Sequence, residues 1–287
     1  MTIRKNVIKL TRGGRKMKTD QEIKLVAVDV DGTFVRSDYT YDVDRFKVLL
    51  EHMKAIDCHF VVASGNQYYQ LRSLFPDYHE ELSFVAENGA FVKDMTELVF
   101  NANIDQTIVH DIIDFCDQYP EIQYVLCGVN SAYVGRAKIS PAFFDEMAIY
   151  YPRLQWVDDL KAVKDQILKF GFRVNVEDTE KYLQLFSEKL AGKLVPTGSG
   201  YGYIDLILPG CHKASGIQRL VERWGLTAAQ CVAFGDGCND IEMLQYCGRS
   251  YAMENAPDEV KAVAKAICPS NEEQGVLATL EKLFSES

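Results

Sequence analysis

Apolar residues recur in the first third of the chain with two different periods. Three short apolar runs have the length and composition of buried β-strands: 24–30, 59–63 and 84–86. Apolar positions at helical spacing fill the two segments between them, Tyr41–Ile56 and Gln67–Leu74. This alternation of strands and helices predicts a parallel sheet with helices on its faces.

The same alternation returns near the end of the chain. Predicted helices there are 214–224, 240–246, 257–264 and 274–284, and predicted strands are 231–234 and 250–253. We therefore predict an α/β fold whose Rossmann-like parallel-sheet core comes from two separated segments, 23–92 and 207–287.

The middle of the chain, 93–206, has a different texture. Helical patterns at 106–118, 141–150 and 179–190 mix with β runs at 124–127, 132–134, 167–174 and 203–208. The glycine-rich GSGYGY at 198–203 is typical of a tight turn. We interpret this part as an α+β domain inserted into the core.

Residues 1–22 are basic and lack the continuous apolar stretch of a signal peptide. We expect either a disordered leader there or an upstream start codon, with Met17 as the natural first residue. The alternative is an interaction arm.

Composition and charge narrow the class of protein. Hydrophobic residues make up 47% and charged residues 25%, which is typical of a soluble globular protein. The net charge of -10 disfavours a broad nucleic-acid surface, and no apolar run approaches the roughly 20 residues that cross a bilayer. The eight cysteines contain no Cys-x-x-Cys pair, so we expect reduced, mostly buried thiols in a cytoplasmic protein.

Four polar clusters follow the predicted core strands. They are Asp29-Val-Asp31-Gly-Thr33, Ser64-Gly65-Asn66, Glu87-Asn88-Gly89 and Gly235-Asp236-Gly237-Cys238-Asn239-Asp240, and Lys213 stands at a predicted helix start. Ligands of an open parallel sheet bind beyond the carboxyl ends of its strands. Clustered carboxylates repel one another, and Mg²⁺, which prefers oxygen ligands, would offset that repulsion. Hydroxyl, amide, ammonium and backbone N–H groups suit a phosphate beside the metal.

In this order the clusters resemble the four motifs of haloacid-dehalogenase-type phosphatases: DxDGT, a small hydroxyl residue, a downstream lysine and GDGxND. The long insert resembles the cap of the Cof-like branch, and the stretches VVASGNQYYQL, SFVAENGA and YIDLILPGCHKASGI resemble bacterial sugar phosphatases of that branch. Many Cof-like members have Thr-Gly-Arg where this chain has Ser64-Gly65-Asn66, so serine keeps the hydroxyl and the arginine is missing.

The resemblance implies roles for the carboxylates. Asp29 would be the nucleophile that forms a phospho-aspartate, and Asp31 the acid and base. Asp29, the backbone carbonyl of Asp31 and Asp236 would bind Mg²⁺, while Asp240 would be a further ligand or would orient the others. If the strand continues through both aspartates, their side chains leave one face and Val30 points away.

The resemblance also implies a phosphate site and a specificity site. Phosphate-binding candidates are Gly32, Ser64, Gly65, Lys213 and Asn239. The insert would close over the sugar and contribute substrate contacts but no phosphoryl-transfer groups. Polar candidates at its turns are Asn130, Ser131, Thr197 and Ser199.

Each of these residues also has a structural interpretation. Asp29 and Asp31 could cap a turn, Ser64 could be a helix N-cap, and Lys213 could be a solvated surface lysine. Four other residues or pairs are interpreted as follows: Asn88 and Gly89 as a strand-end turn, His212 as a weaker candidate base, Cys238 as a spacer, and Tyr68 and Tyr69 as packing residues of a helix.

We therefore predict a cytoplasmic Mg²⁺-dependent phosphatase of small phosphorylated metabolites, sugar phosphates foremost, acting as a monomer or small homo-oligomer without nucleic-acid or membrane partners. The alternatives on the same site are a nucleotide or cofactor phosphatase and a phosphomutase. A non-catalytic sensor of phosphorylated ligands is disfavoured because Asp29 is present.

Overall fold

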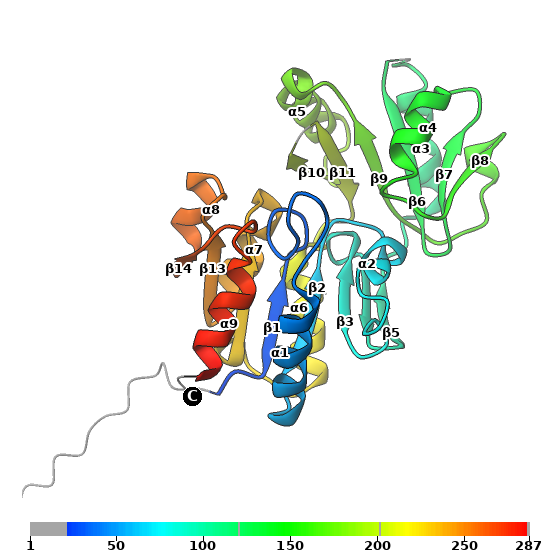
Figure 1. Ribbon diagram of the computed structural model, residues 1–287. Helices are drawn as coiled ribbons and strands as arrows, with labels where there is room; N and C mark the ends of the chain where they lie inside the picture. Colours follow the sequence, from blue (N-terminus) through cyan, green and yellow to red (C-terminus); the bar gives the residue numbers. More distant parts are fainter. Residues whose placement is uncertain (1–21, 120, 201, 286–287) are drawn as a thin grey trace, which may run out of the picture.

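The computed structural model describes residues 22–119, 121–200 and 202–285, which form a core and a cap (Figure 1). The core is built on an eight-stranded sheet with the strand order β14-β13-β12-β1-β2-β3-β4-β5. Its strands are β1 Leu25–Val28, β2 His59–Ala63, β3 Ser83–Ala86, β4 Phe91–Asp94, β5 Glu97–Asn101, β12 Cys231–Gly235, β13 Arg249–Met253 and β14 Ala266–Cys268. All pairs from β14 to β3 are parallel, so the predicted α/β class is confirmed.

Helices cover both faces of this sheet. One face packs against α1 (Val43–Ala55), α2 (Tyr68–Leu74) and α9 (Gly275–Ser285), and the other against α6 (Lys213–Arg223), α7 (Ile241–Tyr246) and α8 (Asp258–Val263). Because β1 is buried on both sides, its residues are apolar without alternation. All six helices begin and end within two residues of the predicted bounds.

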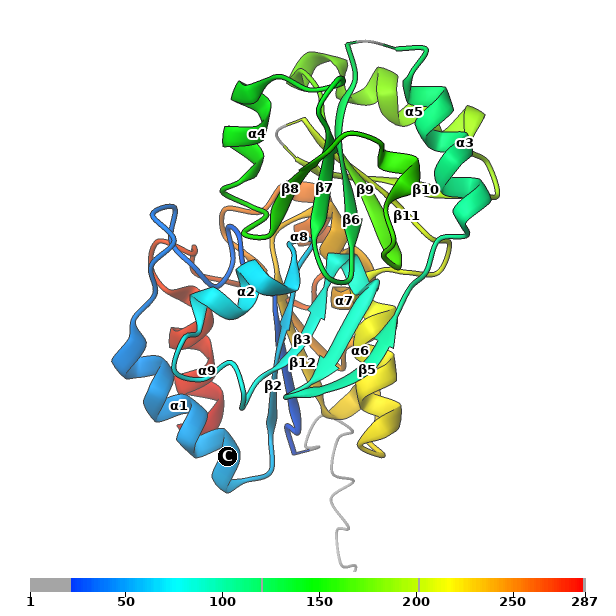
Figure 2. The ribbon, with the colours of Figure 1, turned by 90° about the vertical axis from the view of Figure 1, so that its right-hand side faces the viewer.

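The cap has its own six-stranded sheet, in the order β10-β11-β9-β6-β7-β8 (Figure 2). Its strands are β6 Gln123–Gly128, β7 Ala132–Gly135, β8 Leu154–Val157, β9 Ile167–Arg173, β10 Val195–Gly200 and β11 Tyr203–Ile207. One apolar cluster includes α3 (Gln106–Cys116) and α5 (Thr179–Lys189), and another includes α4 (Pro141–Met147).

The core takes up more of the chain than we predicted. β4 pairs antiparallel with β3, and β5 with β4, so residues up to Asn101 belong to the core sheet although the predicted insert begins at residue 93. The hairpin was missed because its strands are short and carry charged residues. β8, β10 and β14 were also not predicted, and residues 198–200, which were predicted to belong to a tight turn, lie in β10.

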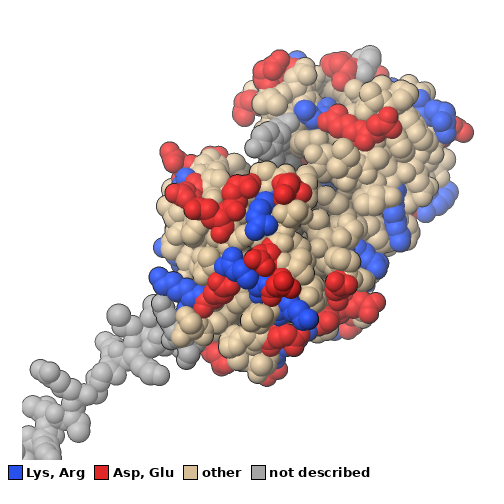
Figure 3. All heavy atoms as spheres, viewed as in Figure 1, with Lys and Arg blue, Asp and Glu red and all other residues tan. Residues whose placement is uncertain are grey.

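Other expectations concern the surface and the thiols. On the face shown in Figure 3, acidic and basic side chains are intermixed. All eight cysteines are free and only Cys238 is exposed, as predicted. In the described residues, no helix has both the length and the apolar character needed to cross a membrane. The predicted leader, apart from Glu22, lies outside the described residues.

Candidate active site

The first strand ends earlier than the DxDGT interpretation assumed. β1 stops at Val28, and the chain then turns, with the carbonyl of Val30 accepting the backbone N–H groups of residues 33–35. The strand therefore does not continue through both aspartates, and the alternation of side chains along a strand does not determine where they point. Asp29 and Asp31 nevertheless line one cavity, while Val30 is buried in the apolar core.

A lysine from beyond the cap reaches the first aspartate. The Lys213 ammonium donates hydrogen bonds of 2.6 Å to Asp29 Oδ1 and to Asp240 Oδ1, and it is buried. Lys213 begins α6, and His212 is the N-cap, with a ring nitrogen accepting the backbone N–H of Ser215. The surface interpretation of Lys213 is thus wrong, and His212 serves as a cap.

Three carboxylates converge beside this lysine. Oxygen atoms of Asp29, Asp236 and Asp240 all lie within 4.8 Å of one another. Burial, with added repulsion from Asp236 and Asp31, raises the pKa of Asp29 to about 7. Burial and the charge of Asp240 raise the pKa of Asp236 to about 6.

This donor set fits a hard divalent cation. Oxygen ligands alone suit Mg²⁺, and a bound cation would stabilise the ionised carboxylates that burial disfavours. Gly32 makes room for the cluster, because its φ is +75° and a Cβ there would lie 2.4 Å from Asp236 Oδ2. Thr33 Oγ1 donates to Asp236 Oδ1 at 2.7 Å and fixes that carboxylate.

Asp240 has a different environment from Asp236. It is fully buried, and its Oδ2 accepts the backbone N–H groups of Asp236 and Gly237 at 3.0 and 2.9 Å. It therefore shapes the loop that presents Asp236, in addition to pairing with Lys213. Cys238 stands outside the carboxylate group, with Sγ 2.9 Å from Glu259 Oε1, in keeping with a spacer.

The second motif forms a tight loop over the cavity. Ser64 is buried, and its Oγ accepts the backbone N–H of Asn66 at 3.1 Å. The Asn66 amide donates to Asp31 Oδ2 at 2.6 Å. Asn66, which stands where many Cof-like members have arginine, therefore contacts the predicted acid.

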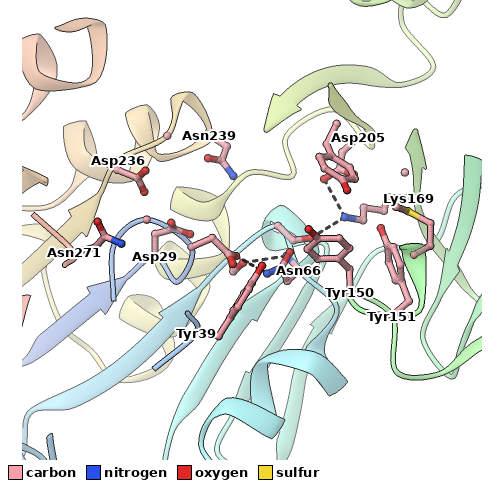
Figure 4. A pocket seen from close by; sticks show the side chains of 18 of the residues that line it. Asp29, Tyr39, Asn66, Tyr150, Tyr151, Lys169, Asp205, Asp236, Asn239 and Asn271 are labelled. Atoms are coloured by element: carbon pink, nitrogen blue, oxygen red, sulfur yellow. Dashed lines mark hydrogen bonds and ion pairs between the residues drawn. The ribbon is translucent and has the colours of Figure 1, made fainter. Parts of the chain in front are cut away.

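One cavity of about 550 Å³ joins core and cap (Figure 4). Core groups on its wall include Asp29, Asp31, Ser64, Gly65, Asn66, Asp236 and Asn239, and cap groups include Met147, Tyr150, Tyr151, Lys169, Phe172, Tyr203 and Asp205. The structure thus brings the predicted core residues together. The lining residues of the cap were not predicted, because single tyrosines and one lysine in apolar runs carry no motif.

Three of the four predicted cap residues lie away from this cavity. Neither Asn130, Ser131 nor Thr197 lines the cavity, and the side chain of Ser199 is outside what the structure describes. Asn130 instead donates to Asp165 Oδ1 at 2.9 Å. Residues at these turns were chosen for polarity alone, and polarity does not show which end of a strand faces the core.

Tyr68 and Tyr69 are packing residues, as predicted. Tyr68 packs edge-on against Phe84 in the core, and Arg153 of the cap lies over the Tyr69 ring at 3.5 Å. The Glu87–Gly89 turn, in contrast, is more than a strand end. Asn88 is buried, and its amide donates to Asp205 Oδ2 at 2.8 Å and accepts from Asn239 Nδ2 at 3.1 Å.

Comparison with known proteins agrees with this geometry. A family model of haloacid dehalogenase-like hydrolases matches residues 26–280. The chain belongs to this family. It is 42% identical to the 5-amino-6-(5-phospho-D-ribitylamino)uracil phosphatase YbjI of Escherichia coli (strain K12), covering 91% of this chain and 96% of that protein. It is 24% identical to the phosphatase YitU of Bacillus subtilis (strain 168), which has the same enzyme name, over 91% and 97% of the two chains.

Solved structures with a similar fold include phosphatases. The crystal structure of SMU.1108c from Streptococcus mutans UA159 is 37% identical and matches with a TM-score of 0.87 over 92% of this chain and 100% of that one. A subclass IIB sugar phosphatase that is 18% identical shares the fold, with a TM-score of 0.76. Family and relatives together make this chain a phosphoric monoester hydrolase.

Proposed function

We propose that this hydrolase is a Mg²⁺-dependent phosphatase that forms a phospho-aspartate on Asp29 and releases an uncharged sugar- or polyol-type alcohol. The observation that carries the proposal is the single cavity, which has phosphoryl-transfer groups on one wall and tyrosines on the other. Small-molecule sites of this kind combine a few placed polar groups with an apolar or aromatic lining.

Asp29 and Asp31 divide the reaction into two steps. A carboxylate oxygen of Asp29 attacks phosphorus, the bond from phosphorus to the ester oxygen breaks, and Asp31 gives its proton to the leaving oxygen. Asp31 then takes a proton from water as the water oxygen attacks the phosphoryl group. Phosphate leaves, and Asp29 is restored as a carboxylate.

The surrounding residues stabilise charge during both steps. Lys213, 2.6 Å from Asp29, neutralises the nucleophile and the transferring phosphoryl group. Ser64, Asn239 and backbone N–H groups of the loop at Gly65 would hold phosphate oxygens. Asp29, Asp236 and the backbone carbonyl of Asp31 would hold Mg²⁺, which supplies further charge neutralisation at the phosphoryl oxygens.

The lining supports an uncharged leaving group. Among the described lining residues, Lys169 is the only lysine or arginine, and its ammonium is already bonded to Asp205 and to the carbonyl of Gly65. A second phosphate or a carboxylate on the substrate would thus meet no available cation there. The phenols of Tyr39, Tyr150 and Tyr203 offer hydroxyl partners and ring faces instead.

The relatives' printed substrate fits these requirements. A ribitylaminouracil phosphate has one phosphoryl group, a polyol chain and a planar ring, and the tyrosines suit both the chain and the ring. We therefore propose this compound as the first candidate within the sugar- and polyol-phosphate class.

A phosphate-release assay tests the proposal. The panel contains 5-amino-6-(5-phospho-D-ribitylamino)uracil, ribitol 5-phosphate, glucose 6-phosphate, a nucleoside monophosphate and fructose 1,6-bisphosphate, each with Mg²⁺ or with EDTA. We expect Mg²⁺-dependent release of inorganic phosphate, fastest from the ribityl compound and slowest from the bisphosphate. Formation of an isomeric phosphate ester without inorganic phosphate would identify a phosphomutase, and preference for the bisphosphate would contradict the uncharged leaving group.

A further inference from the structure

Lys169 is a buried cap lysine that the mechanism above does not use. It lies in β9 with 2% of its surface exposed. Its Nζ donates to the carbonyl of Gly65 at 2.7 Å and to Asp205 Oδ2 at 2.9 Å, and it lies 2.9 Å from Glu87 Oε2. Gly65 and Glu87 belong to the core, so one ammonium joins the cap to two core segments. Figure 4 shows Lys169 pointing toward Asp205.

A second connection runs through the same carboxylate. Asp205 Oδ2 also accepts from the Asn88 amide at 2.8 Å, and Asn88 Oδ1 accepts from Asn239, which lies in the loop between Asp236 and Asp240. Glu87 and Asn88 both have φ of 52°, a left-handed conformation that residues other than glycine rarely adopt. Such backbone is maintained only where its surroundings hold it, and here those surroundings include two cap residues.

We propose that Lys169 and Asp205 are positioning residues through which the cap completes the phosphate-binding loop of the core. Lys169 holds the carbonyl of Gly65, between Ser64, which faces the cavity, and Asn66, which bonds Asp31. Asp205 holds Asn88 and through it Asn239. The cap therefore takes part in phosphoryl transfer, in addition to selecting the substrate. This inference rests on the proposed function.

Two simpler interpretations explain less of the geometry. A substrate-binding lysine would direct its ammonium to the ligand, but this ammonium donates hydrogen bonds to Gly65 and Asp205 and lies 2.9 Å from the buried carboxylate of Glu87. A purely stabilising ion pair has little reason to be buried, since apolar residues often serve stability as well. It would also not require a bond to the backbone of the loop that carries Ser64.

The inference has a distinctive kinetic consequence. The leaving group of acetyl phosphate is acetate, which is too small for extensive contact with the cap. A cap residue that only selects substrates should therefore not affect its hydrolysis. A residue that positions the loop should affect it, because small displacements of catalytic groups cost up to about 10²-fold in rate. Binding of inorganic phosphate, with Mg²⁺ present, should weaken for the same reason.

The test uses the full chain, three variants of the cluster and one control variant. Lys169→Met removes the ammonium. Lys169→Met combined with Glu87→Gln keeps the cluster's net charge, because one lysine and two carboxylates give −1 and Asp205 alone also gives −1. Asp205→Asn preserves size and is the mildest change. Lys193→Met is the matched control, since it removes a cap lysine that pairs with Asp111 at the surface.

Circular dichroism and thermal unfolding first check that the double variant is folded. We expect this variant to lose about 10²-fold in kcat/KM for acetyl phosphate. Its dissociation constant for inorganic phosphate, measured by calorimetry with Mg²⁺, should rise about tenfold, and Asp205→Asn should shift both values in the same direction. The Lys193→Met control should match the wild type. The proposal would be overturned if the double variant and Asp205→Asn both stayed within twofold of the wild type. This applies to kcat/KM for acetyl phosphate and to the dissociation constant for inorganic phosphate.

The calorimetric measurement does not require turnover. If the wild type binds phosphate but hydrolyses nothing, the proposed function fails, while the comparison of dissociation constants still decides whether the cap positions the loop.

Discussion

Lys213 Nζ lies 2.6 Å from Asp29 Oδ1, although the two residues are 184 positions apart in the sequence. Between them the chain forms the core elements from α1 to β5 and then the whole cap, and the first turn of α6 returns to the end of β1. The lysine pairs with Asp29 and Asp240 but not with Asp236. Asp29 thus belongs both to the ion pair with Lys213 and to the candidate metal site, whereas Asp236 belongs only to the candidate metal site. The roles of Lys213 and of the metal can therefore be separated by substitution.

Asp29→Asn should abolish turnover while leaving the fold intact. The amide keeps the shape of the carboxylate but is not a nucleophile and carries no charge for the metal. We expect a loss of at least about 10³-fold in kcat, measured as phosphate release with Mg²⁺ present. Near-wild-type release by this variant would exclude a phospho-aspartate on Asp29.

Lys213→Ala and Asp236→Ala should differ in their response to Mg²⁺. Asp236→Ala removes a candidate ligand, so its lower activity should recover in part as the Mg²⁺ concentration rises. In the proposed mechanism the charge of Lys213 acts on phosphate and on Asp29, so extra Mg²⁺ should not restore the activity of Lys213→Ala. The measurement is kcat/KM as a function of Mg²⁺ concentration, and equal recovery of the two variants would contradict these roles.

Stabilisation of the protein by Mg²⁺ should depend on pH. In the metal-free protein the pKa is raised from 3.8 to about 7 for Asp29 and to about 6 for Asp236. The folded state therefore binds these protons more tightly than the unfolded state. The resulting stability is present below about pH 3.8 and is lost progressively as pH rises from there through the folded-state values of about 6 and about 7. Mg²⁺ favours the ionised carboxylates and should offset that loss.

Thermal unfolding with EDTA or MgCl₂ checks this prediction. The increase in Tm caused by Mg²⁺ should be larger at about pH 8 than at about pH 5. The Asp236→Ala variant serves as a control, because it lacks one of the two carboxylates and should show a smaller difference. An increase that is equal at both pH values would mean that the carboxylates do not bind the metal.

Local patterns account for the parts of the structure that were predicted. Strands buried on both faces, such as β1, give continuous apolar runs, and amphipathic helices such as α1 give regular spacing. The turn after β1 and the start of α6 carry motifs that are local in sequence, so Asp29 and Lys213 could be identified. These features need no knowledge of how distant segments pack.

The remaining features depend on contacts between distant segments. Lys169 lies in the run ILKFGFR, and nothing nearby in the sequence shows that Glu87 and Asp205 will neutralise it. The tyrosines of the cavity are likewise selected by the placement of the cap over the core. Burial of a charged residue is therefore a tertiary property, and for that reason the cap residues that line the cavity were not predicted.

Asp31→Asn should impair substrates according to their leaving group. In the proposed mechanism Asp31 protonates the leaving oxygen, and loss of such acid catalysis typically costs about 10²–10⁴-fold. p-Nitrophenyl phosphate has an acidic leaving group that needs little protonation, so its hydrolysis should fall less than that of a sugar phosphate. Equal losses for the two substrates would mean that Asp31 is not the acid.

Asn66→Ala extends the same comparison to the residue that replaces the arginine of related sequences. Its amide lies 2.6 Å from Asp31 Oδ2 and orients that carboxyl group. If this is its role, the variant should lose less activity than Asp31→Asn but show the same bias, with sugar phosphate affected more than p-nitrophenyl phosphate. If Asn66 instead binds only phosphate, both substrates should lose activity equally, since both present the same phosphoryl group. The ratio of the two kcat/KM values distinguishes these cases.

The double variant Asp31→Asn with Asn66→Ala provides a further check. Once Asp31 is Asn, removing the Asn66 amide should have little additional effect on that ratio, because residues that act through one another are not additive.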